Sequence, residues 1–378
     1  MARLELQGIC KGFDEPVLDR ITLTVEEGQF FVLVGPSGIG KTTLLRCVAG
    51  LERLDAGRVL VDDRDITDLK PYHRNVAMTF ESYALYPHLT VFENIASPLK
   101  ARRTDPAEIK RRVGSVAELL RIDHLLDRRP HEVSGGQKQR TALGRTLVAR
   151  PDVFLLDEPI SHLDAKIRHE LRRQFHQLED LRRVATVYVT HDYAEALSLG
   201  DRIAVMGHGG LEQVGTAREL FEQPATLFVA RHLGQPSINE IACALEGDGD
   251  GLMARARGAD LRVPVAPRHR QGLAAVNGTP VTLGIRPQHL RVLPPDTTPD
   301  GVPGEGGADA GLPVIEARVE IFEALGAIGV LLAEAGGVSL TALTSPDAHF
   351  EPGQPVRLGM ETGAFHYFSR ETGQNLHL

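Results

Sequence analysis

A short apolar run that ends in a glycine-rich loop constrains the fold of this chain more than any other feature. Residues 30–34 are continuously apolar, as expected of a strand buried on both faces. The following residues 42–49 have a helical pattern, and Gly50 is a suitable stop. Between strand and helix stands a loop of the form Gly-x-x-x-x-Gly-Lys-Thr-Thr: Gly35, Pro36, Ser37, Gly38, Ile39, Gly40, Lys41, Thr42 and Thr43. The order strand, loop, helix predicts a phosphate-binding loop in an α/β domain.

The chemistry of this loop is that of nucleotide binding. Its glycines allow backbone amides to converge on phosphates, and the helix N-terminus adds a partial positive charge. We expect Lys41 to contact the β- and γ-phosphates and the Thr42 hydroxyl to ligate Mg²⁺. An ordinary glycine turn is the alternative, and such a pattern arises by chance in on the order of 1% of chains of this length.

Two acidic residues end a second apolar run, residues 153–156. We assign Asp157 to Mg²⁺ and Glu158 to the general base that activates the attacking water. The alternative is an acidic pair that caps the next helix, and the phosphate loop upstream argues against it. His191 follows a third apolar run, residues 185–189, where it can reach a γ-phosphate, although a lone histidine is more often structural.

The segment Ser134, Gly135, Gly136 and Gln137 precedes a helical stretch. A serine hydroxyl and backbone amides at a helix N-terminus form an anion site. Simple helix capping is the alternative, because serine is a good N-cap. Nothing nearby in the sequence supplies an adenine pocket, so we expect the phosphate to belong to a nucleotide held by another subunit.

Strands alternate with helices in the first half, which predicts a largely parallel sheet with its sites at the carboxyl ends of the strands. Residues 106–149 are helical throughout and predict a helical subdomain inserted into the α/β core. Past about residue 235, short strand-like runs at 281–285, 314–321 and 356–360 predict a β-rich barrel or pair of barrels. Residues 294–311 have the composition of an acidic loop or linker.

Composition excludes several classes of protein. With 42 basic and 50 acidic residues, the net charge of −8 and the lack of a basic tract disfavour general nucleic-acid binding. No run of about eighteen apolar residues is present, and the first residues enter a strand-like pattern instead of a signal peptide. Three scattered cysteines argue against a disulfide framework and for a reducing cytoplasm.

The order of these motifs resembles the ATP-binding cassette (ABC) ATPases over roughly residues 3–235. The resemblance implies a P-loop NTPase core, ATP and Mg²⁺ as cofactors, and closure of two subunits on two ATP molecules. It implies that Phe13 stacks on adenine, although a core phenylalanine fits equally well. It makes His191 the switch histidine. It also places Asp164 in the loop of residues 161–164, which communicates across the dimer in the family. In this loop His162 replaces the usual Asn.

One departure from the family pattern concerns Glu81. The segment of residues 78–87 resembles the loop that normally carries a glutamine contacting Mg²⁺ and relaying its state to the membrane subunits. A carboxylate is a good ligand for a hard cation, so Glu81 is a candidate metal ligand and catalytic residue. It also adds negative charge near the γ-phosphate, which leaves open whether the dimer is formed by two identical subunits or two different ones.

The C-terminal region resembles the oligomer-binding-fold extension of importer ATPases, through residues 283–290 and 366–373. We therefore predict an ABC nucleotide-binding domain at 1–235, with its helical subdomain at about 88–150, and an OB-fold-like regulatory domain at 236–378. The likeness points to the carbohydrate-uptake group, whose members import maltose, sn-glycerol-3-phosphate or polyols. The unusual residues 79–83 slightly favour glycerol or another polyol over oligosaccharides.

The expected partners follow from this resemblance. They are a second ABC ATPase subunit, two integral-membrane permeases, and indirectly a periplasmic or lipoprotein solute-binding protein. The chain itself is expected to be a peripheral protein at the cytoplasmic face of the inner membrane. Residues 83–91 are expected to form the groove for a permease helix. The alternatives are an importer for iron, polyamine, sulfate or phosphonate, a soluble ABC ATPase acting on nucleic acid or ribosomes, and a protein that regulates a transcription factor.

Overall fold

The computed structural model describes residues 3–80, 82–161, 163–176, 178, 181, 183–248, 251–256, 261–273, 278–294 and 312–377. The chain forms two compact units, Met1–Glu219 and Leu220–Leu378, and each is described by itself. The sequence predictions on Glu81 and His162, and all but the first residue of the linker predicted at 294–311, lie outside the described residues.

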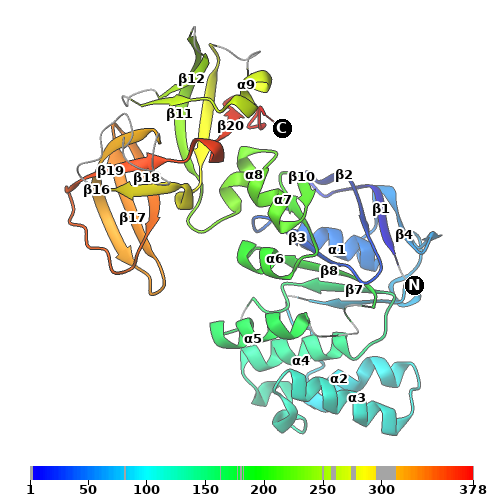
Figure 1. The fold of residues 1–378 in the computed structure, drawn as a ribbon. Coiled ribbons are helices and arrows are strands. Elements are labelled where there is room, and N and C mark those ends of the chain that lie inside the picture. The colour runs from blue at the N-terminus through cyan, green and yellow to red at the C-terminus, as the bar shows by residue number, and fades with distance from the viewer. Residues whose placement is uncertain are drawn as a thin grey trace. The chain divides into compact units, whose positions relative to one another are not determined.

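The first unit alternates strands and helices along the chain (Figure 1). Its strands are β1 (Leu4–Gly12), β2 (Pro16–Val25), β3 (Phe30–Val34), β4 (Ala56–Val61), β5 (Arg64–Asp65), β6 (Val76–Thr79), β7 (Val153–Asp157), β8 (Ala185–Thr190), β9 (Arg202–Met206) and β10 (Leu211–Gly215). Its helices are α1 (Lys41–Ala49), α2 (Val91–Ala101), α3 (Pro106–Leu119), α4 (Gly135–Leu147), α5 (Ala165–Phe175) and α6 (Tyr193–Leu199), and α7 (Ala217–Glu222) runs into the second unit.

Two sheets build the core of this unit. The six-stranded sheet has the order β10-β9-β3-β8-β7-β6, in which only the edge strand β10 is antiparallel to its neighbour. The second sheet, β2-β1-β4-β5, is antiparallel throughout. Residues of both sheets and of α1 form one hydrophobic cluster. The parallel sheet, predicted from the alternation of strands and helices, is confirmed, and its order brings the carboxyl ends of β3, β7 and β8 side by side.

Helix α1 ends where the sequence predicts, and the structure shows why. Gly50 adopts φ +75° as its C-cap, a conformation that favours glycine. The guanidinium of the buried Arg74 donates through Nη1 to the Cys47 and Val48 carbonyl oxygens at 3.0 and 2.8 Å. These bonds satisfy carbonyl groups that a helix end leaves without an intrahelical partner.

The helices α2, α3 and α4 pack on one another as the predicted helical subdomain, with sequence-coded caps at their starts. Thr90 and Glu93 form a capping box on α2, and Asp105 accepts from the amides of residues 107 and 108 ahead of Pro106 in α3. Figure 1 shows α4 with α2 and α3 on the other side of β7 and β8 from α1.

The second unit is β-rich, as predicted. After α8 (Leu227–His232) come β11 (Asn239–Asp248), β12 (Gly251–Ala256), β13 (Arg262–Pro264), α9 (Pro267–Leu273), β14 (Pro280–Ile285), β15 (Leu290–Leu293), β16 (Val314–Ala324), β17 (Gly329–Ala335), β18 (Val338–Thr344), β19 (Pro355–Met360) and β20 (His366–Ser369). They form two antiparallel sheets, β13-β12-β11-β14-β20 and β15-β19-β16-β17-β18, which share one hydrophobic cluster. The buried Asn239 joins the sheets by exchanging hydrogen bonds with the backbone of Thr341.

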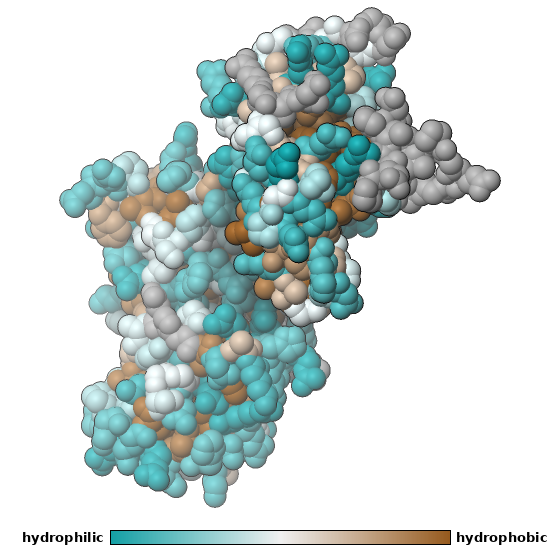
Figure 2. Space-filling model, turned by 90° about the vertical axis from the view of Figure 1, so that its left-hand side faces the viewer, coloured by the Kyte–Doolittle hydropathy of each residue, from teal (hydrophilic) through white to brown (hydrophobic). Residues whose placement is uncertain are grey.

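The surface is that of a protein with most apolar side chains inside. The face shown in Figure 2 is mostly hydrophilic, with scattered apolar patches. In the part of the chain that the structure describes, no helix combines the length and the apolar character that crossing a membrane requires. Cys10, Cys47 and Cys243 are free thiols.

Candidate functional site

The glycine-rich loop has a backbone that only glycine adopts easily. Gly38 and Gly40 have φ of +81° and +104°, and a Cβ on Gly40 would lie 2.9 Å from Val17 Cγ1. The buried Lys41 Nζ donates to the Gly35 and Pro36 carbonyl oxygens at 2.9 and 2.8 Å, so the loop wraps around the lysine ammonium. The loop therefore keeps a cation at the N-terminus of α1, which suits a phosphate group.

Thr42 and Asp157 meet at the carboxyl edge of the parallel sheet. The Thr42 hydroxyl donates to Asp157 Oδ1 at 3.1 Å, and the Asp157 amide donates to Thr79 Oγ1 at 2.9 Å. A hydroxyl and a carboxylate are oxygen ligands of the kind Mg²⁺ prefers. The described residues contain no group of three or more His, Cys, Asp or Glu that could hold a metal alone.

Glu158 and His191 form the second pair at this edge. His191 Nδ1 lies 2.9 Å from Glu158 Oε2, and the Glu158 side chain is the more buried of the two. Glu158 has φ of +43°, a strained backbone for a residue with a side chain, and its amide donates to the Val189 carbonyl at 3.0 Å. The backbone of β8 thus holds the carboxylate in a fixed place beside the histidine.

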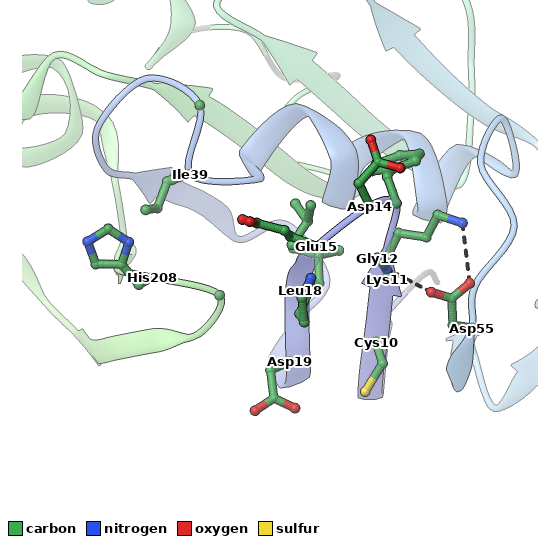
Figure 3. Close-up of a pocket in the computed structure, with 15 residues that line it drawn as sticks. Cys10, Lys11, Gly12, Asp14, Glu15, Leu18, Asp19, Ile39, Asp55 and His208 are labelled. Carbon is green, nitrogen blue, oxygen red and sulfur yellow. Dashed lines mark hydrogen bonds and ion pairs between the residues drawn. The ribbon is translucent and has the colours of Figure 1, made fainter.

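Phe13 lies at a pocket of about 1020 Å³ that is also lined by Gly38 and Ile39 of the glycine-rich loop. Figure 3 shows Ile39 at this pocket together with Lys11 and Asp55. Its side chain is 62% exposed, so it is no core residue. Lys11 Nζ stands 5.0 Å from the ring centroid and also pairs with Asp55, which accepts from the Gly12 amide at 2.7 Å. The hydrogen bond from the Gly12 amide and the contact with the Lys11 ammonium lower the pKa of the Asp55 carboxyl. Sequence reasoning missed Lys11 and Asp55, which no motif marks.

The Ser134 segment begins α4 with a capping box. The Ser134 hydroxyl accepts from the Gln137 amide at 3.3 Å, and the Gln137 side chain accepts from the Ser134 amide at 2.8 Å. Ser134 and Gly135 are exposed, whereas Gly136 packs toward Leu163. The capping function is therefore realised, and the helix N-terminus faces solvent on a different side of the sheet from α1 (Figure 1).

Three further contacts tie the separate motifs together, and sequence reasoning missed them. Gln139 of α4 donates to the Glu158 carbonyl at 3.1 Å. Arg145, also of α4, donates to the Ala84 and Tyr83 carbonyls at 2.7 and 3.1 Å, next to Glu81 in the sequence. Both Tyr83 and Ala84 have positive φ. Helix α4 therefore contacts the acidic edge and the residues that follow Glu81.

Arg168 of α5 connects the two loops that carry Asp164 and His191. Its Nη2 donates to the carbonyls of Ser161 and Leu163 at 2.9 and 3.1 Å, and it lies 3.9 Å from the carboxylates of Asp192 and Glu195. Asp164 itself caps α5 through the amide of residue 167 at 2.9 Å.

The charge of Glu195 is buried among hydroxyl groups of β8. Glu195 accepts hydrogen bonds from Tyr188 and Thr190 at 2.9 Å each. Burial raises the pKa of the Glu195 carboxyl, and burial beside Glu195 raises that of Tyr188. Arg168 and Glu195 thus form an ion pair near the sheet edge that carries Glu158 and His191.

Comparison with known proteins assigns the chain to a family. The ABC transporter pattern matches residues 18–161, the MalK OB fold domain residues 234–290, and the TOBE domain residues 283–368. A protein of Yersinia enterocolitica named sn-glycerol-3-phosphate import ATP-binding protein UgpC is 41% identical over 377 residues, 99% of each chain. The chain belongs to the ABC transporter ATP-binding proteins. A relative with the same name from Ruegeria pomeroyi is 40% identical over 100% of this chain and 99% of its own.

Solved ABC cassettes share the fold of the first unit. The dimeric structure of MJ0796, a bacterial ABC transporter cassette, is 28% identical, with a TM-score of 0.53 over 57% of this chain and 99% of that one. Its post-hydrolysis state, bound to ADP and Pi, matches with the same TM-score at 27% identity.

This chain is therefore an ATP-binding, ATP-hydrolysing subunit of an ABC import transporter. The predicted family, the fold of a P-loop core followed by an OB-fold-like part, and the ATPase activity are confirmed. The predicted domain boundary at 235/236 and the roles of the individual site residues stay predictions.

Proposed function

We propose that this chain drives the import of sn-glycerol-3-phosphate or a closely related phosphorylated polyol. The identity of about 40% to relatives named for that solute extends over the full chain, including the second unit. For the ATPase step, the observation that carries the proposal is the Glu158–His191 pair at the same sheet edge as the Thr42–Asp157 pair. The relatives described above are named for sn-glycerol-3-phosphate import and not for the import of iron, polyamine, sulfate or phosphonate.

Each side chain at this edge has a distinct task in the proposal. Lys41 exchanges its carbonyl partners for phosphate oxygens, and Thr42 and Asp157 hold Mg²⁺. When bound, Mg²⁺ neutralises charge on the transferring phosphoryl group. Glu158 accepts a proton from the attacking water, and His191 holds the Glu158 carboxylate in position. Phe13 stacks on the adenine, with Lys11 fixed on Asp55 beside it.

The proposal requires two subunits for each active site. The start of α4, from Ser134 to Gln137, with Ser134 and Gly135 exposed, binds the phosphates of the nucleotide held by the facing subunit, and Asp164 lies at that contact. The facing subunit is a second copy or a different ABC ATPase. The dimer lies at the cytoplasmic face of the membrane, where its closure on ATP moves two integral-membrane permeases and hydrolysis reopens it.

The permease contact is proposed on residues 83–91. Ala84 and Tyr86 line a groove of about 570 Å³ together with Pro98 and Arg145. The half-exposed Tyr86 ring lies 5.6 Å from the Arg145 guanidinium. An aromatic and apolar groove of this kind suits a short helix of a permease. The solute-binding protein delivers the solute to the permeases from outside.

The test is transport by the reconstituted complex. The chain is combined with its permeases in proteoliposomes that contain ATP and Mg²⁺, and uptake of labelled sn-glycerol-3-phosphate is measured in the presence of the solute-binding protein. We expect uptake with the wild-type chain and a loss of at least 100-fold in hydrolysis and uptake with Glu158→Gln. Binding of ATP by this variant, measured by calorimetry, is expected to persist. Uptake of maltose with none of sn-glycerol-3-phosphate would contradict the proposed solute, and full activity of Glu158→Gln would contradict the proposed base.

A further inference from the structure

A cavity in the second unit is lined by basic side chains that have no role in the ATP hydrolysis or solute import proposed above. It measures about 570 Å³, within the usual size range of small-molecule sites. Its walls come from the end of α7, from α9, from the turn after β14, and from the C-terminal residues beside β20. In Figure 1 the C-terminus lies next to α9 and β20. The basic and aromatic residues that line it are Phe221, Arg268, His269, Arg286, His289, Phe365, His366 and His377.

Two guanidinium groups face this cavity without an acidic partner. Arg286 is only 2% exposed, and its hydrogen bonds all go to the carbonyl oxygens of Phe221 and Leu233. Arg268 donates through Nε to His269 Nε2 at 2.9 Å. Within the described residues neither guanidinium forms an ion pair with a carboxylate. A buried cation that lacks a counter-charge is costly, and an anion in the cavity would relieve that cost.

The histidines supply hydrogen-bonding atoms that have no partner. His366 is 8% exposed, and its Nδ1 is buried without a hydrogen bond, as is the Nδ1 of His377. The rings of His269 and His377 lie 4.0 Å apart, and those of His366 and His377 are stacked at 5.8 Å. Burial lowers the pKa of His366 to about 3 and that of His377 to about 4, so both rings are neutral at pH 7 and each has one N–H to donate.

Acidic groups and metal ions do not account for this cluster. His289 is engaged by Glu361, which lies outside the cavity lining, at 2.7 Å from Nδ1 to Oε2. Among the described residues that line the cavity, the carboxylate is that of Glu222, an exposed residue. In the described part of the chain, no three His, Cys, Asp or Glu residues are arranged to hold a metal. Guanidinium groups bind phosphate and carboxylate with two parallel hydrogen bonds, and imidazole N–H groups add further donors.

We propose that this cavity binds a small phosphate-bearing molecule, either inorganic phosphate or a phosphate monoester. Arg268 supplies the positive charge at the entrance of the cavity, because it is exposed on α9. Its Nη2 atom lies close to Gly363, at 3.9 Å from the position that a Cβ on this glycine would take. Arg286 and the unpartnered ring nitrogens form the buried end. The site is independent of the transported solute proposed above, because its evidence lies wholly in the second unit.

The test is calorimetric titration of the full chain saturated with a non-hydrolysable ATP analogue and Mg²⁺, so that the nucleotide site contributes no heat. The probes are inorganic phosphate, sn-glycerol-3-phosphate and uncharged glycerol. We expect saturable binding of at least one phosphate probe and none of glycerol. Binding of both phosphate probes identifies the free anion as sufficient, and binding of the ester alone identifies a monoester site.

The variants separate the cavity from general charge effects. Arg268→Gln is expected to weaken binding roughly tenfold or more, the loss for a charged hydrogen bond. Arg270→Gln is the matched control, since Arg270 lies on the same helix, donates to the Val265 carbonyl and does not line the cavity. A His377→Gln variant gives a second reading if Arg268→Gln folds poorly. The proposal would be overturned if neither phosphate probe bound saturably at 1–10 mM, which is on the order of weak metabolite affinities. It would also be overturned if both cavity variants bound phosphate as the wild type does.

Discussion

At the scale of single residues, the site depends on side chains that connect its loops. Arg168 holds the backbone before Asp164 by two hydrogen bonds and stands near Asp192 and Glu195, which follow His191. A planar guanidinium reaches several oxygen atoms at once, whereas a lysine ammonium is a single point charge. The geometry of both loops therefore depends on this one side chain.

We predict that Arg168→Lys lowers kcat for ATP about tenfold and changes the KM little. The residues that we assign to nucleotide binding stay in place, while the loops that close the dimer lose their common anchor. Steady-state ATPase kinetics of the reconstituted transporter measure the effect. The control is Arg173→Lys, an exposed position on the same helix. An unchanged kcat in Arg168→Lys would contradict this role.

A second prediction at this scale concerns Glu81. The family resemblance would place the Glu81 carboxylate, and its negative charge, near the γ-phosphate, so we expect Glu81→Gln to change the rate of hydrolysis or its coupling to transport. Hydrolysis and uptake are measured together at several Mg²⁺ concentrations. Indistinguishable kinetics and uptake for the two proteins would show that the charge is unimportant. Purification of the complex with one kind of ATPase polypeptide would exclude two different ATPase subunits.

At the scale of elements, the ends of α1 carry the constraints. Its start is the glycine-rich loop, and its end is Gly50 packed against the buried Arg74. A Cβ on Gly50 would lie 2.6 Å from Arg74 Cζ, and the residue would keep its positive φ at a cost. The helix end and the arginine that caps it are thus a single packed unit.

We predict that Gly50→Ala lowers the free energy of unfolding by about 1–3 kcal/mol through strain and displacement of Arg74. Gly114→Ala is the matched comparison within α3, where a Cβ meets no atom within 4 Å, and it is expected to stabilise by about 0.5–1 kcal/mol. Urea unfolding of both variants followed by circular dichroism makes the measurement. Equal stability of the two variants would show that the Arg74 contact does not constrain position 50.

At the scale of the whole molecule, the second unit makes stability depend on pH. The folded state keeps His366 neutral, with a pKa of about 3, whereas an unfolded histidine titrates near 6.5. Below about pH 6.5 the unfolded chain binds a proton that the folded chain refuses, so stability falls as the pH is lowered and is unaffected above that value. The neighbouring His377 acts in the same direction.

We predict that His366 alone costs about 2 kcal/mol of stability at pH 5 relative to pH 7.5. The measurement is urea unfolding at both pH values, in a buffer without phosphate, for the wild type and His366→Gln. The variant is expected to lose less stability on acidification. An identical loss in both proteins would mean that His366 is not buried in a neutral state.

The local elements of this protein follow from short-range chemistry. The apolar runs at 30–34, 153–156 and 185–189 become buried strands, because continuous apolar residues in a parallel sheet are covered on both faces. The conformation of the loop from Gly35 to Thr42 also follows from nearby residues, because Gly38 and Gly40 adopt positive φ angles that residues with a side chain rarely adopt. The family resemblance then supplied ATP and the dimer, which short-range patterns do not contain.

What the sequence by itself determined is the family, the order of the elements and the chemistry-bearing motifs, because these depend on residues close together in the chain. Only the tertiary structure decided that Arg168 joins the loops of Asp164 and His191, that Asp55 fixes Lys11 beside Phe13, and that four histidines and two arginines share one cavity. These groups lie tens to more than a hundred residues apart in the sequence or carry no motif. Their proximity is set by sheet order and packing, which no local pattern encodes.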